Sequence, residues 1–319
     1  MFDPVKIASI PGMIEPIEQQ TLYGLASQLS LRPEDQMVEF GSFFGRSTEC
    51  LAQGLRDNPQ RKASNQLHAY DSFGCAVQGG FAVHVNSFAK SGNVSNLLLK
   101  DEGRLNFYPV FEHYLAEQIE SALVRPTKKE IHDSEAGEIH QIVLMHIDSP
   151  KFYDELRYLL ERFFPRLRNG ALVVFQDFYY HWSATLIAAV EAMRQMHILE
   201  YRLSAASSLV TQINRTIDAE VIAELDRQMA NPAQVTQLIL KAIEESKKIQ
   251  IDRPEIFIPR LWLAAYQHLW EQHKSEEATN LIAKFFGSGA KLGQSVLNDY
   301  LEMMRFRFSI RNLYELDHS

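Results

Sequence analysis

The sequence has few cysteines, no long apolar run and no cluster of basic residues. Its two cysteines, Cys50 and Cys75, have neither the spacing of a metal motif nor the pattern of a disulfide framework, which suits a reducing cytoplasm. The longest apolar stretch, around residues 261–269, is far too short to span a bilayer. The first residues lack the charged and apolar regions of an export signal. We therefore expect a cytoplasmic protein with no membrane partner.

The charge balance argues against a nucleic-acid partner. The formal net charge is −8, and affinity for phosphates comes largely from clustered Lys and Arg, which the chain lacks. With 319 residues, of which 46% are hydrophobic and 23% are charged, the chain can bury a sizeable core. These values predict a globular protein of one large domain or two smaller ones.

Residues 37–48, with the sequence MVEFGSFFGRST, are the most informative stretch. They predict the end of a buried strand, a loop that contains Gly41 and Gly45, and a helix that begins near Ser47. Such a junction offers backbone N–H donors, and its glycines let a ligand approach the main chain where a Cβ would clash. We expect a small charged ligand to bind there.

Two acidic residues accompany this stretch. Glu39 lies inside an apolar strand end, where an unpaired carboxylate would be costly, so we expect it to have a cationic or hydroxylated partner. Asp71 follows the next strand-like run, residues 67–70. At this distance α/β nucleotide sites place the carboxylate that accepts hydrogen bonds from a ribose.

The motif at residues 39–47, EFGSFFGRS, resembles the first motif of class I S-adenosylmethionine (SAM)-dependent methyltransferases. It has the E-x-G-x-x-x-G-x-S form of the catechol, caffeoyl-CoA and macrocin O-methyltransferases. A dinucleotide fold would need G-x-G-x-x-G, but position 43 is phenylalanine, so a nucleotide-dependent oxidoreductase is the less favoured alternative. The resemblance covers about residues 15–215 and implies SAM binding by Glu39, Gly41, Ser42, Gly45, Ser47 and Asp71.

The order of the predicted elements indicates an α/β fold with a doubly wound, mostly parallel, Rossmann-like methyltransferase sheet over residues 1–215. Strands are expected at residues 37–40, 67–70, 104–110, 142–148 and 171–175, and an antiparallel pair at 198–203 and 208–213. Helices are expected at residues 16–31, 47–55, 111–124, 153–168 and 183–196. Residues 73–100 have no sustained periodicity, which fits a lid or substrate loop, or an ordinary surface insertion. Residues 127–138 are expected to form a solvated loop.

Residues 216–319 form a second region in which apolar residues recur only at helical spacing. We expect an all-α C-terminal domain. About a hundred residues can bury only part of the apolar faces that carry Trp262, Trp270, Phe285 and Phe286. The remainder is expected to cap the acceptor pocket or, as we favour, to form a homodimer.

The fourth strand ends in the sequence HIDSPK, residues 146–151. Its D-x-x-K spacing resembles that of the catechol and caffeoyl-CoA enzymes, which implies that Asp148 binds a divalent metal and Lys151 is the general base. A bound Mg²⁺ lowers the pKa of the acceptor oxygen, and a lysine near that ion has a lowered pKa. The alternative is that the acid caps the next helix and the lysine is solvated. We expect His146 to be a core residue.

The fifth strand departs from these relatives. It ends in Gln176 and Asp177, where they have Asp-Asn or Asp-Asp as metal ligands. A glutamine offers only a neutral carbonyl oxygen, which weakens a site for a hard cation. If the metal is lost, His181 is a second candidate base, since histidine titrates near neutral pH. Residues 179–182, YYHW, are otherwise an aromatic wall of the pocket.

The function expected from the resemblance is transfer of a methyl group from SAM to a hydroxyl of a small acceptor, such as a sugar or a phenol. SAM and Mg²⁺ would be the cofactors. The rival hypothesis is a non-catalytic SAM-fold protein that uses its helical tail for binding or as a scaffold. The sequence does not name the acceptor.

Overall fold

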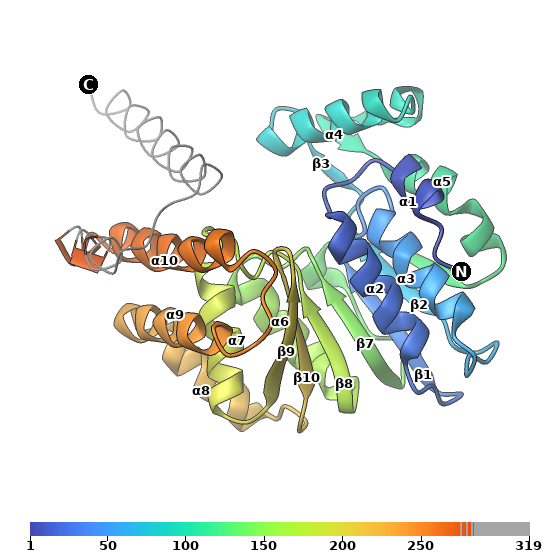
Figure 1. Cartoon of the computed structure of the whole chain (residues 1–319). Helices are drawn as coiled ribbons and strands as arrows, with labels where there is room; N and C mark the ends of the chain where they lie inside the picture. Colours follow the sequence, from blue (N-terminus) through green and yellow to red (C-terminus); the bar gives the residue numbers. More distant parts are fainter. Residues whose placement is uncertain (275, 279, 282, 284–319) are drawn as a thin grey trace.

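A seven-stranded sheet is the centre of the fold (Figure 1). The computed structural model describes residues 1–274, 276–278, 280, 281 and 283. In the order of the sheet the strands are β6 (Val124–Lys128), β2 (Leu67–Asp71), β1 (Asp35–Phe40), β7 (Gln141–Ile147), β8 (Leu167–Phe175), β10 (Ser208–Ile213) and β9 (Leu199–Ala205).

Five of these strands are parallel, and the last two close the sheet as an antiparallel pair. The central strand β7 is buried along almost its whole length, as expected for an apolar strand covered on both faces. The predicted doubly wound, mostly parallel sheet and its closing pair are confirmed. All five parallel strands direct their carboxyl ends to one edge, where ligands bind in such folds.

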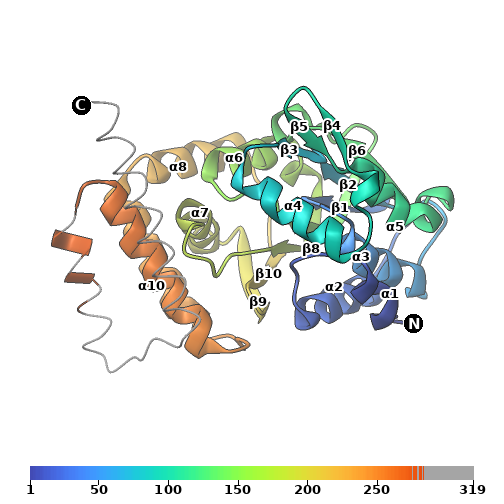
Figure 2. The same ribbon diagram turned by 90° about the horizontal axis from the view of Figure 1, so that it is seen from above.

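Helices cover both faces of this sheet (Figure 2). One core contains side chains of α1 (Pro4–Ser9), α2 (Pro16–Gln28), α3 (Arg46–Asp57), α4 (Gly80–Ser91) and α5 (Tyr108–Glu120). The other contains side chains of α6 (Tyr153–Arg162) and α7 (Ala184–Gln195). Each helix buries its apolar face against the sheet or a neighbouring helix, which is why 3.6-residue periodicity identified most of them.

The predicted helical region after residue 216 is confirmed over the described residues. It contains α8 (Ala219–Met229), α9 (Pro232–Ser246) and α10 (Pro254–Glu271). Leu238 of α9 and Leu261 of α10 are buried in the same core as Leu186 of α7, so these helices pack on the sheet domain. A domain boundary at residue 216 stays a prediction. The apolar residues Ile282, Phe285 and Phe286 lie outside the described residues.

The predicted third strand is wrong. Residues 104–106 form β5 (Arg104–Asn106) of a separate three-stranded sheet with β3 (Gly74–Ala76) and β4 (Leu99–Asp101), and α4 occupies much of the expected loop at 73–100. The third parallel strand is β6, at the edge of the main sheet. An edge strand can be polar and can contain a proline such as Pro126, so its pattern resembled a loop.

The boundary between α6 and β8 also differs from the prediction. The helix ends at Arg162, a 3₁₀ turn follows at Phe164–Arg166, and the strand begins at Leu167. Gly170 therefore lies inside β8, with φ +82°, where the pairing with β7 shifts register. A glycine at a β-bulge explains this, because the bulge needs a conformation that other residues rarely adopt.

Gly41 connects β1 to the loop that precedes α3. Its φ is +89°, and a Cβ placed on it would lie 2.7 Å from the backbone nitrogen of Ser149. The loop after β1 therefore touches the loop after β7 through main-chain atoms. Only glycine satisfies both the dihedral angle and the close approach.

Replacing this glycine tests the contact between the loops. We expect Gly41→Ala to lower the free energy of unfolding by about 1–2 kcal/mol or more, because of the left-handed conformation and the clash. Gly24→Ala is the matched control: it lies in α2 with no neighbour within 4 Å of the added methyl and should stabilise by about 0.5–1 kcal/mol. Urea unfolding of both variants measures the effects, and equal stabilities would contradict this account.

Candidate functional site

A pocket of about 260 Å³ lies at the carboxyl ends of the parallel strands. It is bounded by the loop after β1, the end of β2, and the loops after β7 and β8. The lining residues are Met13, Gly41, Phe43, Asp71, Ser72, Gly74, Phe81, Phe107, Asp148, Ser149, Lys151 and Asp177. The pocket therefore joins the glycine loop to the acidic ends of three strands.

A second, smaller hollow of about 100 Å³ adjoins it. The two share Asp71, Ser72 and Ser149 as lining residues. Its other lining residues are Phe40, Tyr70 and Glu155, together with Lys129, Glu130, Ile131, His132 and Ser134 of the loop after β6. The carboxylate of Asp71 thus stands between two hollows, which suits a long ligand that bends around it.

Asp71 is held by main-chain donors. The N–H of Phe43 donates to Oδ2 at 2.8 Å, and the N–H of Phe73 donates to Oδ1 at 2.6 Å. Burial raises the pKa of Asp71 to about 6, although these hydrogen bonds act in the opposite direction. Each oxygen has a further lone pair for a ligand hydroxyl.

Phe43 adopts a conformation that is unfavourable for a bulky residue. Its φ is +48°, which costs roughly 1–2 kcal/mol relative to a right-handed conformation. Its N–H bond to Asp71 and its ring contacts with Phe44, at 4.1 Å between centroids, and Phe107, at 5.4 Å, offset this cost. The loop is thus fixed against the strand end and does not depend on glycine alone.

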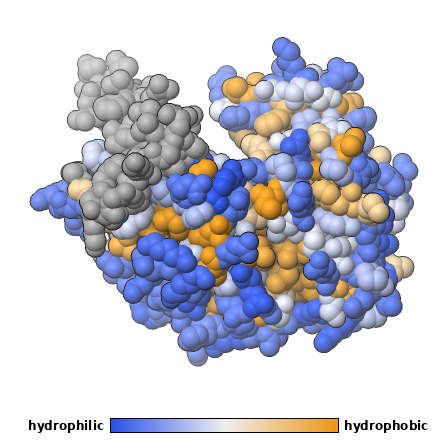
Figure 3. Space-filling model, viewed as in Figure 1, coloured by the Kyte–Doolittle hydropathy of each residue, from blue (hydrophilic) through white to orange (hydrophobic). Residues whose placement is uncertain are grey.

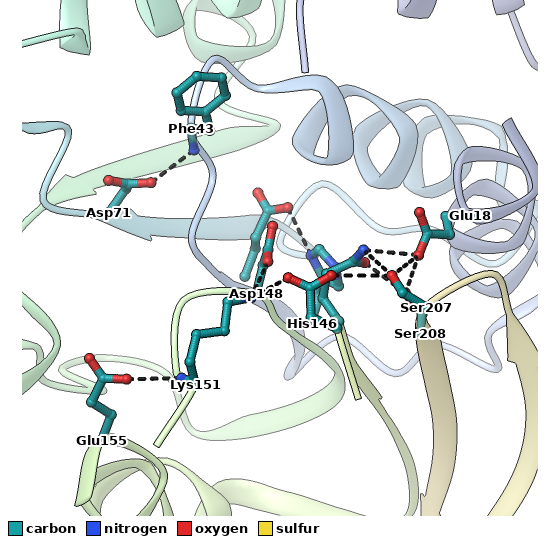
Figure 4. A network of polar contacts seen from close by, with 12 residues as sticks. Glu18, Phe43, Asp71, His146, Asp148, Lys151, Glu155, Ser207 and Ser208 are labelled. Carbon is teal, nitrogen blue, oxygen red and sulfur yellow. Dashed lines mark hydrogen bonds and ion pairs between the residues drawn. The ribbon is translucent and has the colours of Figure 1, made fainter. Parts of the chain in front are cut away.

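A lysine lies between two carboxylates on the opposite wall of the pocket. Lys151 Nζ donates to Asp148 Oδ1 and to Asp177 Oδ2, both at 2.8 Å, and the three side chains are each about a quarter exposed (Figure 4). The main-chain N–H of Lys151 donates to Glu155 at 2.9 Å, which fixes the turn into α6.

The charges that surround Lys151 in the structure raise its pKa, whereas the expected base has a lowered pKa. Burial alone would lower the pKa of Lys151, but the charges of Asp148 and Asp177 outweigh it and raise the pKa above its usual value. The expected lowering of the lysine pKa depends on a metal cation beside the lysine. In the structure the nearest charges are negative, and they favour the ammonium form of the lysine.

A chain of buried polar side chains runs beneath the pocket. Glu39 is fully buried on β1 and accepts hydrogen bonds from the hydroxyls of Ser42, at 3.0 Å, and Thr48. Its other oxygen lies 3.1 Å from Nδ1 of His146 on β7. Glu39 thus has the hydroxylated and cationic partners that its sequence position required. The contacts join the start of α3 to two central strands.

Both ring nitrogens of His146 face oxygen atoms, because Nε2 lies 3.3 Å from Oε1 of Gln176. Burial lowers the pKa of His146, but the hydrogen bond to Glu39 and the charge of Glu39 outweigh it and raise the pKa. A protonated imidazole satisfies both contacts. His146 is the buried core residue that was expected, and it is also an ion-pair partner.

Gln176 extends this chain to α2. Its amide nitrogen donates to Oε1 of Glu18 at 2.9 Å, and its carbonyl oxygen accepts from Ser208 at 2.7 Å. Burial raises the pKa of Glu18. Ser207 Oγ lies 2.9 Å from Glu18 and 3.2 Å from Oδ1 of Asp177, so the buried chain meets the lysine cluster (Figure 4).

The predicted cofactor residues fall into two groups. Gly41 and Asp71 line the pocket, whereas Glu39, Ser42 and Ser47 are buried behind it. Gly45 packs against α5, where a Cβ would lie 2.1 Å from Leu115 Cδ2. Binding of SAM by these residues stays a prediction.

The predicted aromatic wall faces the C-terminal helices. The ring of Tyr179 lies 5.8 Å from that of Phe257 of α10, and the guanidinium of Arg260 lies 4.3 Å from the Tyr180 ring. His181 is 6% exposed, and its ring contacts Trp182. Within the described chain, neither His181 nor its aromatic neighbours belong to the residues that line the pocket. The second candidate base is therefore not among the lining residues of this pocket.

Several lining residues carry no sequence signal of a site. Met13 precedes α2, Phe81 lies in the first turn of α4, and Phe107 precedes α5. Met13 and Phe81 are 56% and 43% exposed. Ser149 could have been found, since it stands inside the HIDSPK motif. The loop 129–134 resembled an ordinary charged surface loop.

The predicted magnesium ligands do not fit a metal site of that kind. Asp148 and Asp177 enclose the ammonium of Lys151, and the side chain of Gln176 is directed into the buried chain, away from them. Over the described residues, no cluster of three or more His, Cys, Asp or Glu side chains could hold a metal ion. No helix in that part of the chain is long and apolar enough to cross a membrane.

Comparison with known proteins agrees with this geometry. Residues 38–178 match a family model described as a methyltransferase domain. This span contains the glycine loop, Asp71 and the lysine cluster. The match identifies these residues as a methyltransferase domain, and the strand order is the one expected for the class I fold.

Solved structures with a similar fold include the O-methyltransferase NovP, at 17% identity and a TM-score of 0.47, with 64% of this chain and 83% of that chain covered. An O-methyltransferase from Bacillus cereus in complex with SAH matches at 10% identity and a TM-score of 0.40, with 67% and 93% covered. At these scores the likeness carries no argument about the substrate. No curated protein matches the chain.

The raised pKa of His146 predicts that the free energy of unfolding depends on pH. Because its pKa is raised in the folded protein, the stabilisation is complete below the unfolded pKa of about 6.5 and is lost as pH rises through the folded value. We expect His146→Asn to cost about 3–5 kcal/mol at pH 6, since it leaves Glu39 buried without its partner, and less at pH 9.

The matched control is His84→Asn, on the exposed surface of α4, which should change stability by less than about 0.5 kcal/mol. Chemical unfolding at several pH values measures both variants. A cost of His146→Asn that stays constant between pH 6 and 9 would mean that the buried imidazole is neutral.

Proposed function

We propose that the protein transfers the methyl group of SAM to a hydroxyl of a small acceptor, such as a sugar or a phenol. The observation that carries this proposal is one pocket that contains both the Gly41–Asp71 wall and the Asp148–Lys151–Asp177 cluster. The first wall suits a nucleoside with an amino-acid tail, and the second suits a reacting hydroxyl. A pocket that joins the two brings donor and acceptor together.

For the cofactor, Asp71 accepts hydrogen bonds from the ribose hydroxyls at the junction of the two hollows. The smaller hollow, beside the loop 129–134, then takes the base, and the larger one takes the methionine part near Gly41. The N-terminus of α3 favours the methionine carboxylate, and Ser47, in its first turn behind the pocket wall, is assigned to a place near that carboxylate. Glu39, Ser42 and Gly45 lie behind the pocket wall and fix the loop between β1 and α3.

SAM supplies an electrophilic methyl group on a sulfonium. For the acceptor, we assign Asp148 as the carboxylate that takes the hydroxyl proton. The oxygen forms its bond to the methyl carbon while the bond between that carbon and the sulfonium sulfur breaks, which leaves S-adenosylhomocysteine. Lys151, as an ammonium, donates a hydrogen bond to the acceptor oxygen and orients it. Asp177 is held by Ser207 and Lys151 and fixes the position of that lysine.

The mouth of the pocket favours an acceptor with an apolar or aromatic portion. Met13 and Phe81 line the pocket and are largely exposed. In the space-filling view apolar residues also appear on the lobe at the upper right and on the slope below it (Figure 3). Met13 and Phe81 can contact a ring while the hydroxyl reaches the polar cluster.

The role of the C-terminal helices is a separate proposal. Arg253, at the start of α10, pairs with Glu15 at 2.6 Å, close to Met13 at the pocket. This contact supports the proposal that α10 helps to shape the side of the pocket that binds the acceptor. Two-fold association through the C-terminal region also remains our proposal for the assembly.

The ribose contact predicts a pH dependence of cofactor binding. The ionised carboxylate of Asp71 accepts hydrogen bonds from the ribose, and its pKa is about 6. Below pH 6 the carboxyl group gains a proton, so the Kd for S-adenosylhomocysteine should rise about tenfold per pH unit. Calorimetry between pH 5 and 8 measures this slope, which Asp71→Asn should abolish. An equal slope in the variant would remove Asp71 from the ribose site.

An assay with labelled SAM and a panel of hydroxylated sugars and phenols tests the proposed reaction. Asp148→Asn should lower kcat by about 10²–10⁴, as expected for loss of a group that accepts a proton, and should leave binding of S-adenosylhomocysteine unchanged. Asp154→Asn, an exposed residue of α6, is the control and should retain activity. Full activity of Asp148→Asn would contradict the assigned role. Tight binding of NAD with no binding of SAM would favour the oxidoreductase alternative.

A further inference from the structure

The position between two strand-end carboxylates is filled by a side chain of the protein itself. Asp148 follows β7, Asp177 follows β8, and these two strands are neighbours in the sheet. Lys151 Nζ contacts one oxygen of each at 2.8 Å. It therefore bridges the carboxylates as a bound cation would.

The charges and the space explain why this bridge excludes a divalent ion. The cluster of two carboxylates and one ammonium has a net charge of −1, whereas two bare carboxylates would attract a divalent cation strongly. A magnesium ion needs oxygens at about 2.0–2.1 Å, so it cannot enter unless Nζ leaves. Removal of Nζ would in turn leave two acidic side chains without their shared partner.

Gln176, the third predicted metal ligand, makes its hydrogen bonds to other side chains. The amide of Gln176 accepts from Ser208 and donates to the carboxylate of Glu18, at 2.7 and 2.9 Å. An aspartate at this position could not donate, and its charge would face that of Glu18. The buried chain therefore requires an amide at the position where the relatives have a metal ligand.

We propose that Lys151 replaces the divalent metal in this pocket, and that its removal uncovers a cation site formed by Asp148 and Asp177. The proposal rests on the proposed function, because it concerns the same acceptor site. Nζ has three N–H donors, of which the carboxylates use two. The third N–H donor can polarise and orient an acceptor oxygen. In a metal site the metal ion would do this.

Binding of Mn²⁺ tests the inference without any assay of activity. Calorimetry and electron paramagnetic resonance would compare the full chain, Lys151→Ala, and Lys151→Ala combined with Asp177→Asn. We expect no saturable site in the full chain, one site at least tenfold tighter in Lys151→Ala, and its loss in the double variant. Lys247→Ala is the matched control, because this exposed lysine is paired with Glu244 at 2.9 Å in α9 and its C-cap.

Two results would overturn the inference. One is a stoichiometric Mn²⁺ site in the full chain that Asp148→Asn abolishes, which needs no lysine variant to be folded. The other is a folded Lys151→Ala, verified by its unfolding transition, that binds Mn²⁺ no better than the full chain. Lys151→Gln is a second variant if alanine prevents folding. Binding of S-adenosylhomocysteine to the full chain, measured separately, distinguishes failure of this inference from failure of the proposed function.

Discussion

The buried ion pair between Glu39 and His146 is the interaction on which the site depends. Both side chains are fully buried, so each charge would be costly without the other. Glu39 also binds the hydroxyls of Ser42 and Thr48, and His146 faces Gln176. One set of contacts thus fixes the glycine loop, the start of α3 and the ends of three strands. The rigid floor lets the loop keep Phe43 in an unfavourable conformation.

The pocket above this floor has two walls with different chemistry. Asp71, with its raised pKa, stands at the junction of two hollows, and the opposite wall is an ion cluster with its lysine in the charged form. Ser207 contacts both Glu18 and Asp177, so the floor and the cluster are joined at the turn between β9 and β10. The same contacts explain why glutamine occupies position 176. The amide completes the floor, and the lysine supplies the positive charge in the pocket.

Much of the fold could be predicted because its parallel strands are buried and its helices are amphipathic. Two of the failures, β6 and the insert around α4, are a polar edge strand and a helix whose residues lacked a clear apolar periodicity. In the site, Asp71 was predicted from its place after a strand, and Asp148, Lys151 and Asp177 were predicted from the resemblance to the catechol and caffeoyl-CoA enzymes. All four line one pocket. The buried contacts beneath them could not be predicted, because Glu18 and Gln176 are 158 positions apart and no local pattern records their contact. The charge state of Lys151 likewise follows from carboxylates that converge only in the fold.

A crystal structure of the protein with S-adenosylhomocysteine tests the central claim most directly. The account predicts that the ribose hydroxyls contact Asp71, with the base beside residues 129–134 and the amino-acid tail near Gly41. It also predicts that Lys151 stays between Asp148 and Asp177, next to the sulfur end of the ligand. A ligand bound elsewhere, or a ribose that does not contact Asp71, would contradict it.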